Sequence, residues 1–263
     1  MHSLIPRFLR VGLQTAHPCQ TLFILAALSL ASAAHAAPLN DTGIGFCEDY
    51  SSNTANCATV SADGGTHPRQ DARYGRDAAA AAGMPKVGGG GKGFDYSKIA
   101  NDGSVLPASA ALGTAPTDWA CTRDNVTGLI WEVKTASGLR GQDHTYTWYV
   151  NGWGSTASGE TCFAAGRCDT EKFVADVNAA GLCGASDWRM PKVKELEGIA
   201  DLGRTNPAID PTYFPNTPSS YFWSGSLANN WSTTWYVSFY YGGAYYYGYQ
   251  SYGYGVRLVR GGQ

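Results

Sequence analysis

Hydrophobic positions in the middle of the chain recur with the period of an α-helix in two segments. The first segment begins at Asp169 or Thr170, either of which can cap a helix, and it ends at Gly181. The second follows Pro191, a residue favoured in the first helical turn, and stops at Gly203. The apolar stripes are Phe173, Val174, Val177 and Ala180 in the first segment and Val193, Leu196, Ile199 and Ala200 in the second. The pattern predicts two amphipathic helices, each with one buried face.

Other segments follow the pattern of β-strands. Residues 129–133 are mostly apolar and predict a buried strand, whereas residues 145–149 alternate Thr with Tyr and Trp and predict a half-exposed one. Two more strands are expected at residues 235–239 and 255–260. Their inward positions are Trp235, Val237, Phe239, Val256 and Leu258. Each of these last two strands is therefore expected to bury one face.

The first 36 residues have the features of an export signal. Arg7 and Arg10 precede an apolar run at residues 22–30, and small residues at 31–36 suit cleavage before Ala37. The apolar run is shorter than the ~20 residues that a membrane span requires. We therefore expect residues 1–36 to be a removed signal peptide, with no membrane span, and the protein to reach the periplasm, the cell surface or the medium.

The mature chain divides by composition into two parts. Residues 37–115 are rich in Gly and Ala and form the predicted N-terminal region, while residues 116–263 form the predicted ligand-binding domain. The glycine run at 88–93 contains Lys92, but no Gly-Lys-Ser/Thr motif follows it. This run is therefore predicted to be a flexible loop rather than a phosphate-binding loop.

Six cysteines follow the predicted signal peptide, and an even number in an oxidising compartment predicts three disulfides. Spacing alone leaves several pairings open. It favours the pairs Cys47–Cys57, Cys162–Cys168 and Cys121–Cys183. The spacing of Cys and His residues gives no metal-ligand motif, so neither a metal nor a cofactor is expected.

The C-terminal part has an unusual composition. Residues 205–256 contain one charged residue, Asp210, and 17 aromatic residues, of which 11 are Tyr. Tyrosine mixed with Gly, Ser and Asn is typical of binding surfaces, because its ring gives a large contact area at a low entropic cost. The segment has no cations to hold phosphates, and the whole chain has a formal net charge of −2, so nucleic acid is not an expected partner. A protein or a glycan is the expected ligand.

Two other classes of function remain open on composition alone. Paired carboxylates can hydrolyse glycans, and Glu132, Glu160, Asp187 and Glu195 are available, although no spacing selects a pair. The tyrosines could also belong to a purely structural surface protein with aromatic cross-strand pairs. His67 and His144 have no sequence context that indicates a catalytic triad, and no catalytic residue is predicted.

Four sequence blocks occur in an order that resembles the Lcl C-terminal domain family, the terminal domain of a bacterial collagen-like adhesin and of other exported proteins. The blocks are WACTRDNVTGLIWE at 119–132, DWRMPKVKEL at 187–196, YFWS at 221–224 and VRLVR at 256–260. The resemblance implies a C-type-lectin-like α+β fold, in which two helices pack on small antiparallel sheets and loops form a ligand face. It also implies adhesion. The chain lacks the collagen-like repeat and the basic face that binding of sulfated glycosaminoglycans needs.

The same fold implies two further comparisons. Variable proteins of diversity-generating retroelements carry Tyr, Ser, Gly and Ala at rewritten positions near the C-terminus, as residues 226–254 do here. The candidate ligand-binding residues are Asn229, Asn230, Trp231, Tyr240, Tyr241, Tyr245, Tyr247, Tyr249, Ser251, Tyr252 and Tyr254. Formylglycine-generating enzymes of this fold use a late cysteine pair, and this chain has no cysteine after Cys183. The resemblance therefore favours a binding protein over an enzyme.

Overall fold

The structure is a computed structural model, and all the residues that it describes belong to the unit formed by residues 37–263. The described ranges are 40–49, 53–54, 57–60, 67–156, 161–228 and 232–261. The predicted signal peptide and the candidate residues Asn229, Asn230 and Trp231 lie outside them.

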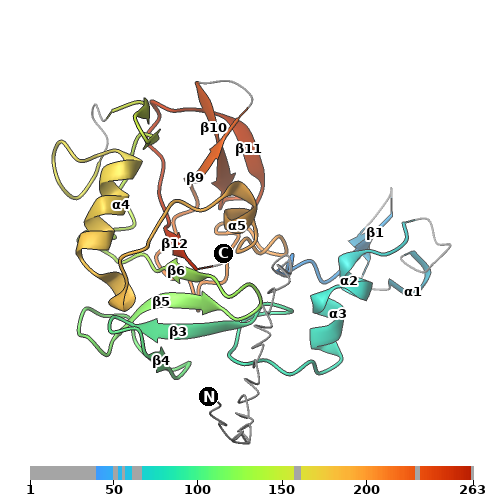
Figure 1. The fold of residues 1–263 in the computed structure, drawn as a ribbon. Helices are drawn as coiled ribbons and strands as arrows, with labels where there is room; N and C mark the ends of the chain where they lie inside the picture. Colours follow the sequence, from blue (N-terminus) through green and yellow to red (C-terminus); the bar gives the residue numbers. More distant parts are fainter. Residues whose placement is uncertain are drawn as a thin grey trace, which may run out of the picture. The chain divides into compact units, whose positions relative to one another are not determined.

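Two antiparallel sheets form the framework (Figure 1). The five-stranded sheet has the order β12-β6-β5-β3-β4, and the three-stranded sheet has the order β11-β10-β9. The larger sheet contains β3 (Tyr96–Ala100), β4 (Val105–Leu106), β5 (Trp119–Asp124), β6 (Ile130–Glu132) and β12 (Val259–Arg260). The smaller contains β9 (Tyr221–Leu227), β10 (Thr233–Ser238) and β11 (Ala244–Tyr249). Two-stranded sheets are formed by β1 (Cys47–Glu48) with β2 (Asn53–Thr54) and by β7 (Tyr149–Val150) with β8 (Trp153–Gly154).

Both helices predicted from the apolar stripes are present. The helices and helical turns are α1 (Cys57–Val60), α2 (Asp71–Tyr74), α3 (Arg76–Ala81), α4 (Thr170–Ala179), the 3₁₀ turn η1 (Leu182–Gly184) and α5 (Val193–Glu197). Asp169 is the residue that caps α4, since its carboxylate accepts a hydrogen bond from the Lys172 amide. Helix α5 ends before Gly203, because the amides of Asp201 and Leu202 bond to other segments of the chain.

The strands bury both faces, in contrast to the single inward face that was expected. On β9, Phe222 enters one core cluster and Trp223 enters the other, and on β10 Val237 and Tyr236 divide in the same way. Successive side chains of a strand point to opposite sides, so these strands lie between two cores. Helix α4 contributes to the cluster that contains Trp223, and α5 contributes to the cluster that contains Phe222.

Two other strand predictions were only partly correct. Within residues 145–149, Tyr146 and Thr147 form isolated bridges and Tyr149 begins β7, so there is no continuous strand. Tyr146 and Trp148 are buried because the chain passes between α4 and the C-terminal segment. Trp235 is only half-buried, since the register shifts between Thr234 and Tyr236 on both sides of β10. The inward positions Val237, Phe239, Val256 and Leu258 are buried as expected.

Three disulfides join the pairs that spacing favoured. Cys47–Cys57 closes the β1–β2 segment onto α1, Cys121–Cys183 joins β5 to η1, and Cys162–Cys168 closes the loop before α4. The Cα–Cα distances of the three pairs are 5.2, 6.5 and 5.2 Å, in the order given. With short helices and small antiparallel sheets, the molecule is a disulfide-stapled, loop-rich α+β protein.

Charged groups lie inside the domain as well as at its surface. The Glu132 carboxylate lies 2.9 Å from the Lys134 ammonium, and both side chains are buried. Burial lowers the pKa of Lys134, while the adjacent Glu132 opposes this change. The Arg257 guanidinium donates to the Glu132 carbonyl and to the Thr217 hydroxyl, at 2.6 Å each. The buried charges of Glu132, Lys134 and Arg257 therefore each have a specific partner that offsets part of the desolvation cost.

The glycine run at residues 88–93 is fixed by specific contacts, contrary to the flexible loop expected from its composition. Gly89 exchanges two backbone hydrogen bonds with Tyr96, and the Gly91 amide donates to Asp210. A Cβ at Gly88 would lie 2.0 Å from the Tyr96 carbonyl oxygen, so a larger residue does not fit there. The run leads directly into β3, which pairs with β5.

Within the described residues, no helix is long and apolar enough to cross a membrane.

Candidate functional site

The C-terminal hairpin, formed by β10 and β11, carries most of the candidate tyrosines. A tight turn joins its strands: the Gly242 amide donates to the Ser238 carbonyl at 2.7 Å. Gly242 has a φ of +85°, and a Cβ there would lie 2.5 Å from Leu202, so both conformation and space require glycine. The turn therefore places the tyrosines that precede and follow it on one hairpin.

Most of the candidate residues in this hairpin and the following turn are exposed. Tyr241 is 63% exposed, whereas Tyr245 and Tyr254 are half-buried against the core cluster that contains Trp223. The exposed members of the predicted set are Tyr240, Tyr241, Tyr247, Tyr249, Ser251 and Tyr252. Exposed rings on paired strands provide a contact surface whose backbone is already ordered.

Part of this surface is hollowed into a pocket of about 440 Å³. We call it the tyrosine pocket. It is lined by Ser219, Ser220, Tyr221, Tyr236, Ser238, Tyr240, Tyr241, Tyr245 and Tyr247. Tyrosine and serine make up the whole lining, so it offers ring faces and hydroxyl groups and carries no formal charge. Hydroxyls both donate and accept hydrogen bonds, a set of groups that suits neutral polar ligands.

Tyr236 is the centre of the ring contacts in this pocket. Its ring centroid lies 5.1 Å from that of Tyr221, 5.5 Å from that of Tyr245 and 5.9 Å from that of Tyr247. Burial, followed by the hydrogen bond with Tyr247, raises the pKa of Tyr236 above its ordinary value. The neutral form of the central phenol is therefore favoured more strongly than in a tyrosine exposed to water.

Tyr254 packs against two rings of the tyrosine pocket, those of Tyr221 and Tyr236, without lining the pocket itself. Its ring lies 4.3 Å from that of Trp223 and 5.1 Å from that of Tyr236, measured between centroids. Its backbone forms an antiparallel bridge with Tyr146. Burial, and then the nearby tyrosines, raise the pKa of Tyr254 to about 12. Tyr254 and Tyr245 thus anchor the exposed rings on the core.

Two exposed tyrosines were missed by sequence reasoning. Tyr221 lines the tyrosine pocket and was assigned only to a family block; strand alternation places it on the same side as the buried Trp223, so alternation alone does not predict its exposure. Tyr246 is 56% exposed and contacts Trp235, outside the pocket. Ser219, Ser220 and Ser238 also line the pocket, and no sequence pattern distinguished them.

The acids proposed for a hydrolase form separate ion pairs. Asp187 lies 2.6 Å from Arg260, Glu195 lies 2.8 Å from Arg189, and Glu132 is paired with Lys134 inside the domain. Arg260 lowers the pKa of Asp187. Glu160 lies outside the described residues. The three described acids thus have structural partners, and none of them lines the tyrosine pocket.

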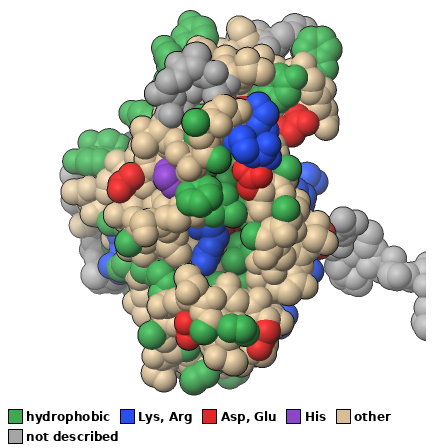
Figure 2. Space-filling model, turned by 90° about the vertical axis from the view of Figure 1, so that its left-hand side faces the viewer, with side chains coloured by type: hydrophobic (Ala, Val, Ile, Leu, Met, Phe, Trp, Pro, Cys, Tyr) green, Lys and Arg blue, Asp and Glu red, His purple; other side chains and the backbone are tan. Residues whose placement is uncertain are grey.

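Charges of both signs are interspersed on the face shown in Figure 2, where hydrophobic side chains form small separate groups. This face therefore has no large field of one sign.

The comparisons with known proteins agree with the family blocks. Comparison with curated proteins and with solved structures found no match. The sequence model described as the Lcl C-terminal domain matches residues 120–260, more than half of the chain. The match contains β5 from its second residue onward, β6, both predicted helices and the C-terminal hairpin. The chain belongs to the Lcl C-terminal domain family.

Proposed function

We propose that this protein is an exported, adhesin-like ligand-binding protein, and that the tyrosine pocket is its recognition surface. The observation that carries the proposal is the group of exposed rings around an uncharged pocket of about 440 Å³. Family membership, three disulfides and the absence of a membrane-spanning helix among the described residues are compatible with an exported adhesin.

The lining favours a neutral glycan, or a protein epitope rich in neutral polar groups. Tyrosine rings pack on the apolar faces of sugar rings, while phenol and serine hydroxyls can bond to sugar hydroxyls. A sulfated or phosphorylated ligand would need cations, and the residues that line the pocket provide none.

A binding array with matched variants tests this proposal. The full chain is applied to an array of neutral, sialylated and sulfated oligosaccharides. We expect binding to neutral members, reduced at least about tenfold in Tyr247→Ala, because that side chain lines the pocket. Tyr246→Ala is the matched control, since Tyr246 has nearly the same exposure (56% against 54%) and lies outside the pocket.

Two outcomes contradict the proposal in its glycan form. If Tyr246→Ala and Tyr247→Ala both bind the oligosaccharides as strongly as the unmodified chain does, the pocket is not the recognition site. If only sulfated members bind, the uncharged lining is not what selects the ligand.

We further propose that a retroelement diversifies residues 226–254, which would alter ligand specificity on a constant framework. The segment contains buried positions such as Val237 and Phe239 as well as exposed ones such as Tyr247, so changes confined to exposed positions leave the core intact. Sequencing the gene from many isolates tests the idea. Codon changes concentrated in this segment are expected, and variation no greater than that in α4 would refute it.

A further inference from the structure

Asp41, Asp71 and Asp77 lie close to one another in space, and all three come well before the residues of the tyrosine pocket in the sequence. Asp41 precedes β1, Asp71 is the first residue of α2, and Asp77 is in α3. One carboxylate oxygen from each lies within 4.8 Å of the others. Asp41 is 5% exposed and Asp77 is 6% exposed, while Asp71 is half-buried. Like charges this close repel one another, so the cluster requires compensation.

The hydrogen bonds of the cluster leave two buried oxygens without a partner. The Gly93 amide donates to Asp41 Oδ2 at 2.9 Å and to Asp77 Oδ1 at 3.1 Å, so one N–H serves two carboxylates. Asp41 Oδ1 and Asp77 Oδ2 are both buried and accept no hydrogen bond. Such orphaned carboxylate oxygens are costly, because they have lost water and gained nothing in return.

The nearby cations do not provide the missing compensation. Among the described residues, no Lys or Arg forms an ion pair within 4.0 Å of any of the three carboxylates. Lys92 acts on Asp77 only as a more distant charge. The Arg76 side chain donates instead to the Gly93 carbonyl.

Two glycines adjoin the cluster, and the space near the carboxylates requires them. A Cβ at Gly75 would lie 1.5 Å from Asp71 Oδ1, and a Cβ at Gly93 would lie 2.5 Å from Arg76 Cβ and 2.8 Å from Asp41 Cγ. Gly75 has a φ of −83°, and Gly93 is not among the glycines with a positive φ, so backbone conformation does not explain either glycine. The close approach of the Asp71 carboxylate explains Gly75, and the close approach of Arg76 together with Asp41 explains Gly93.

We propose that Asp41, Asp71 and Asp77 bind a divalent cation, and that the cation is Ca²⁺. Three carboxylates form a set of hard oxygen ligands, and calcium accepts irregular arrangements of such ligands completed by water. Magnesium demands a stricter octahedron, and zinc prefers the nitrogen and sulfur ligands that this cluster lacks. The expectation of no metal considered only the spacing of Cys and His, and aspartates at positions 41, 71 and 77 form no compact sequence motif.

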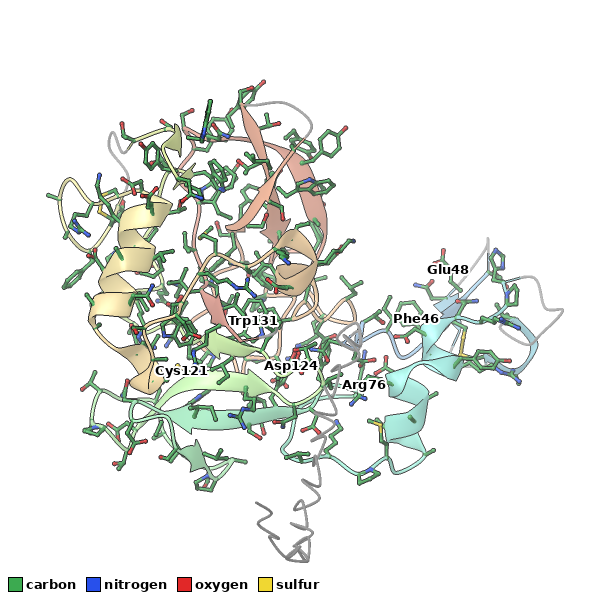
Figure 3. The ribbon with its side chains drawn as sticks, viewed as in Figure 1. Phe46, Glu48, Arg76, Cys121, Asp124 and Trp131 are labelled. Atoms are coloured by element: carbon green, nitrogen blue, oxygen red, sulfur yellow. A yellow bond between two sulfur atoms is a disulfide. The ribbon has the colours of Figure 1, made fainter. Side chains whose placement is uncertain are left out.

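The site would clamp the N-terminal segment to the domain. Asp41 and its neighbours join α2 and α3 to the loop at Gly93, which leads into β3. On the adjoining side, the Asn40 amide donates to the Asp124 carboxylate at the end of β5. Figure 3 labels Arg76 and Asp124 on the two sides of this junction. The inference is independent of the proposed function, because none of these residues lines the tyrosine pocket.

Thermal unfolding and calorimetric titration of the full chain test the site. The probe is CaCl₂ alone, added after chelation of trace metal, with NaCl at matched ionic strength as reference. With an affinity typical of extracellular calcium modules, 10 mM Ca²⁺ raises Tm by about 3–8 °C. The shift is lost in Asp77→Asn and reduced in Asp71→Asn. It persists in Asp143→Asn, which changes an exposed acid outside the cluster.

Two results overturn the proposal. One is the absence of both a Tm shift and binding heat in the unmodified chain. The other is an equal shift in Asp77→Asn. If Asp77→Asn is more stable than the unmodified chain and calcium has no effect on either, Asp41 and Asp77 share a proton instead. If Asp77→Asn does not fold, Asp71→Asn and the titration of the unmodified chain decide the question.

Discussion

The tryptophans of the core and the tyrosines of the C-terminal hairpin use aromatic rings in opposite ways. Trp119, Trp148, Trp188 and Trp223 are buried, and each donates its indole N–H to a backbone carbonyl at 2.8–3.0 Å. Tyr241, Tyr246, Tyr247 and Tyr249 are each more than half exposed. The difference indicates that the tryptophans fix the fold, whereas the outer tyrosines can change without unfolding it.

Removing one ring from each group tests this contrast most strongly. Trp223→Ala loses a fully buried side chain and its hydrogen bond to Tyr146, so we expect the free energy of unfolding to fall by about 3–5 kcal/mol. Tyr247→Ala should cost less than about 1 kcal/mol. Denaturant unfolding measures both. Similar losses would mean that the hairpin rings are structural, as in a purely structural surface protein.

Two of the disulfides allow a similar comparison, between a long and a short closed loop of the backbone. Cys121–Cys183 spans 62 residues and joins β5 to η1, whereas Cys162–Cys168 spans 6 residues. Constraint of the unfolded chain predicts that the paired Cys→Ser variants lose about 4 and about 2 kcal/mol, respectively. Chemical denaturation of each double variant provides the values, and a reversed order would show that strain or packing outweighs loop length.

Breaking a buried ion pair should lower the free energy of unfolding more than breaking an exposed one. Glu132→Gln removes the partner of the buried Lys134, and we expect a loss of about 3 kcal/mol. Asp187→Asn breaks the more exposed pair with Arg260 and should cost about 1 kcal/mol or less. Equal losses in thermal unfolding would contradict the assignment of Glu132 to the core.

The smallest effect concerns the ionisation of the tyrosines. Tyr254 has a pKa of about 12, and that of Tyr236 is also raised, so both should ionise only after unperturbed tyrosines have done so near pH 10. Because the neutral form is favoured in the folded state, their contribution to stability is complete below pH 10 and falls as pH rises through the folded pKa. Titration at 295 nm should show two steps. The later step should shrink in Tyr254→Phe, and a single step near pH 10 would place both phenols in water.

Short-range patterns in the sequence gave the correct helices and disulfides. The stripe from Phe173 to Val177 and the cap at Asp169 identify α4 without any knowledge of its neighbours. The end of helix α5, in contrast, depends on tertiary contacts. Helix α5 is shorter than its stripe because Leu202 bonds to the Thr42 carbonyl, 160 positions earlier in the chain.

The candidate site was predictable in composition but not in geometry. The excess of Tyr over charged residues identified the segment that carries the exposed tyrosines, yet it did not separate exposed Tyr247 from half-buried Tyr245. That distinction depends on the register of β10 with β11, where a shift occurs between Thr234 and Tyr236. The C-type-lectin-like fold and the signal peptide remain predictions.

The position of β3 has a practical consequence for making fragments of this protein. A fragment limited to residues 120–260 would omit β3, whose residues from Tyr96 to Ala100 pair along β5. The uncovered edge of β5 would present unpaired backbone groups beside the buried Ala120 and Cys121. Recombinant fragments for crystallisation or ligand selection should therefore begin before the glycine run at residue 88, or they will tend to associate through that edge.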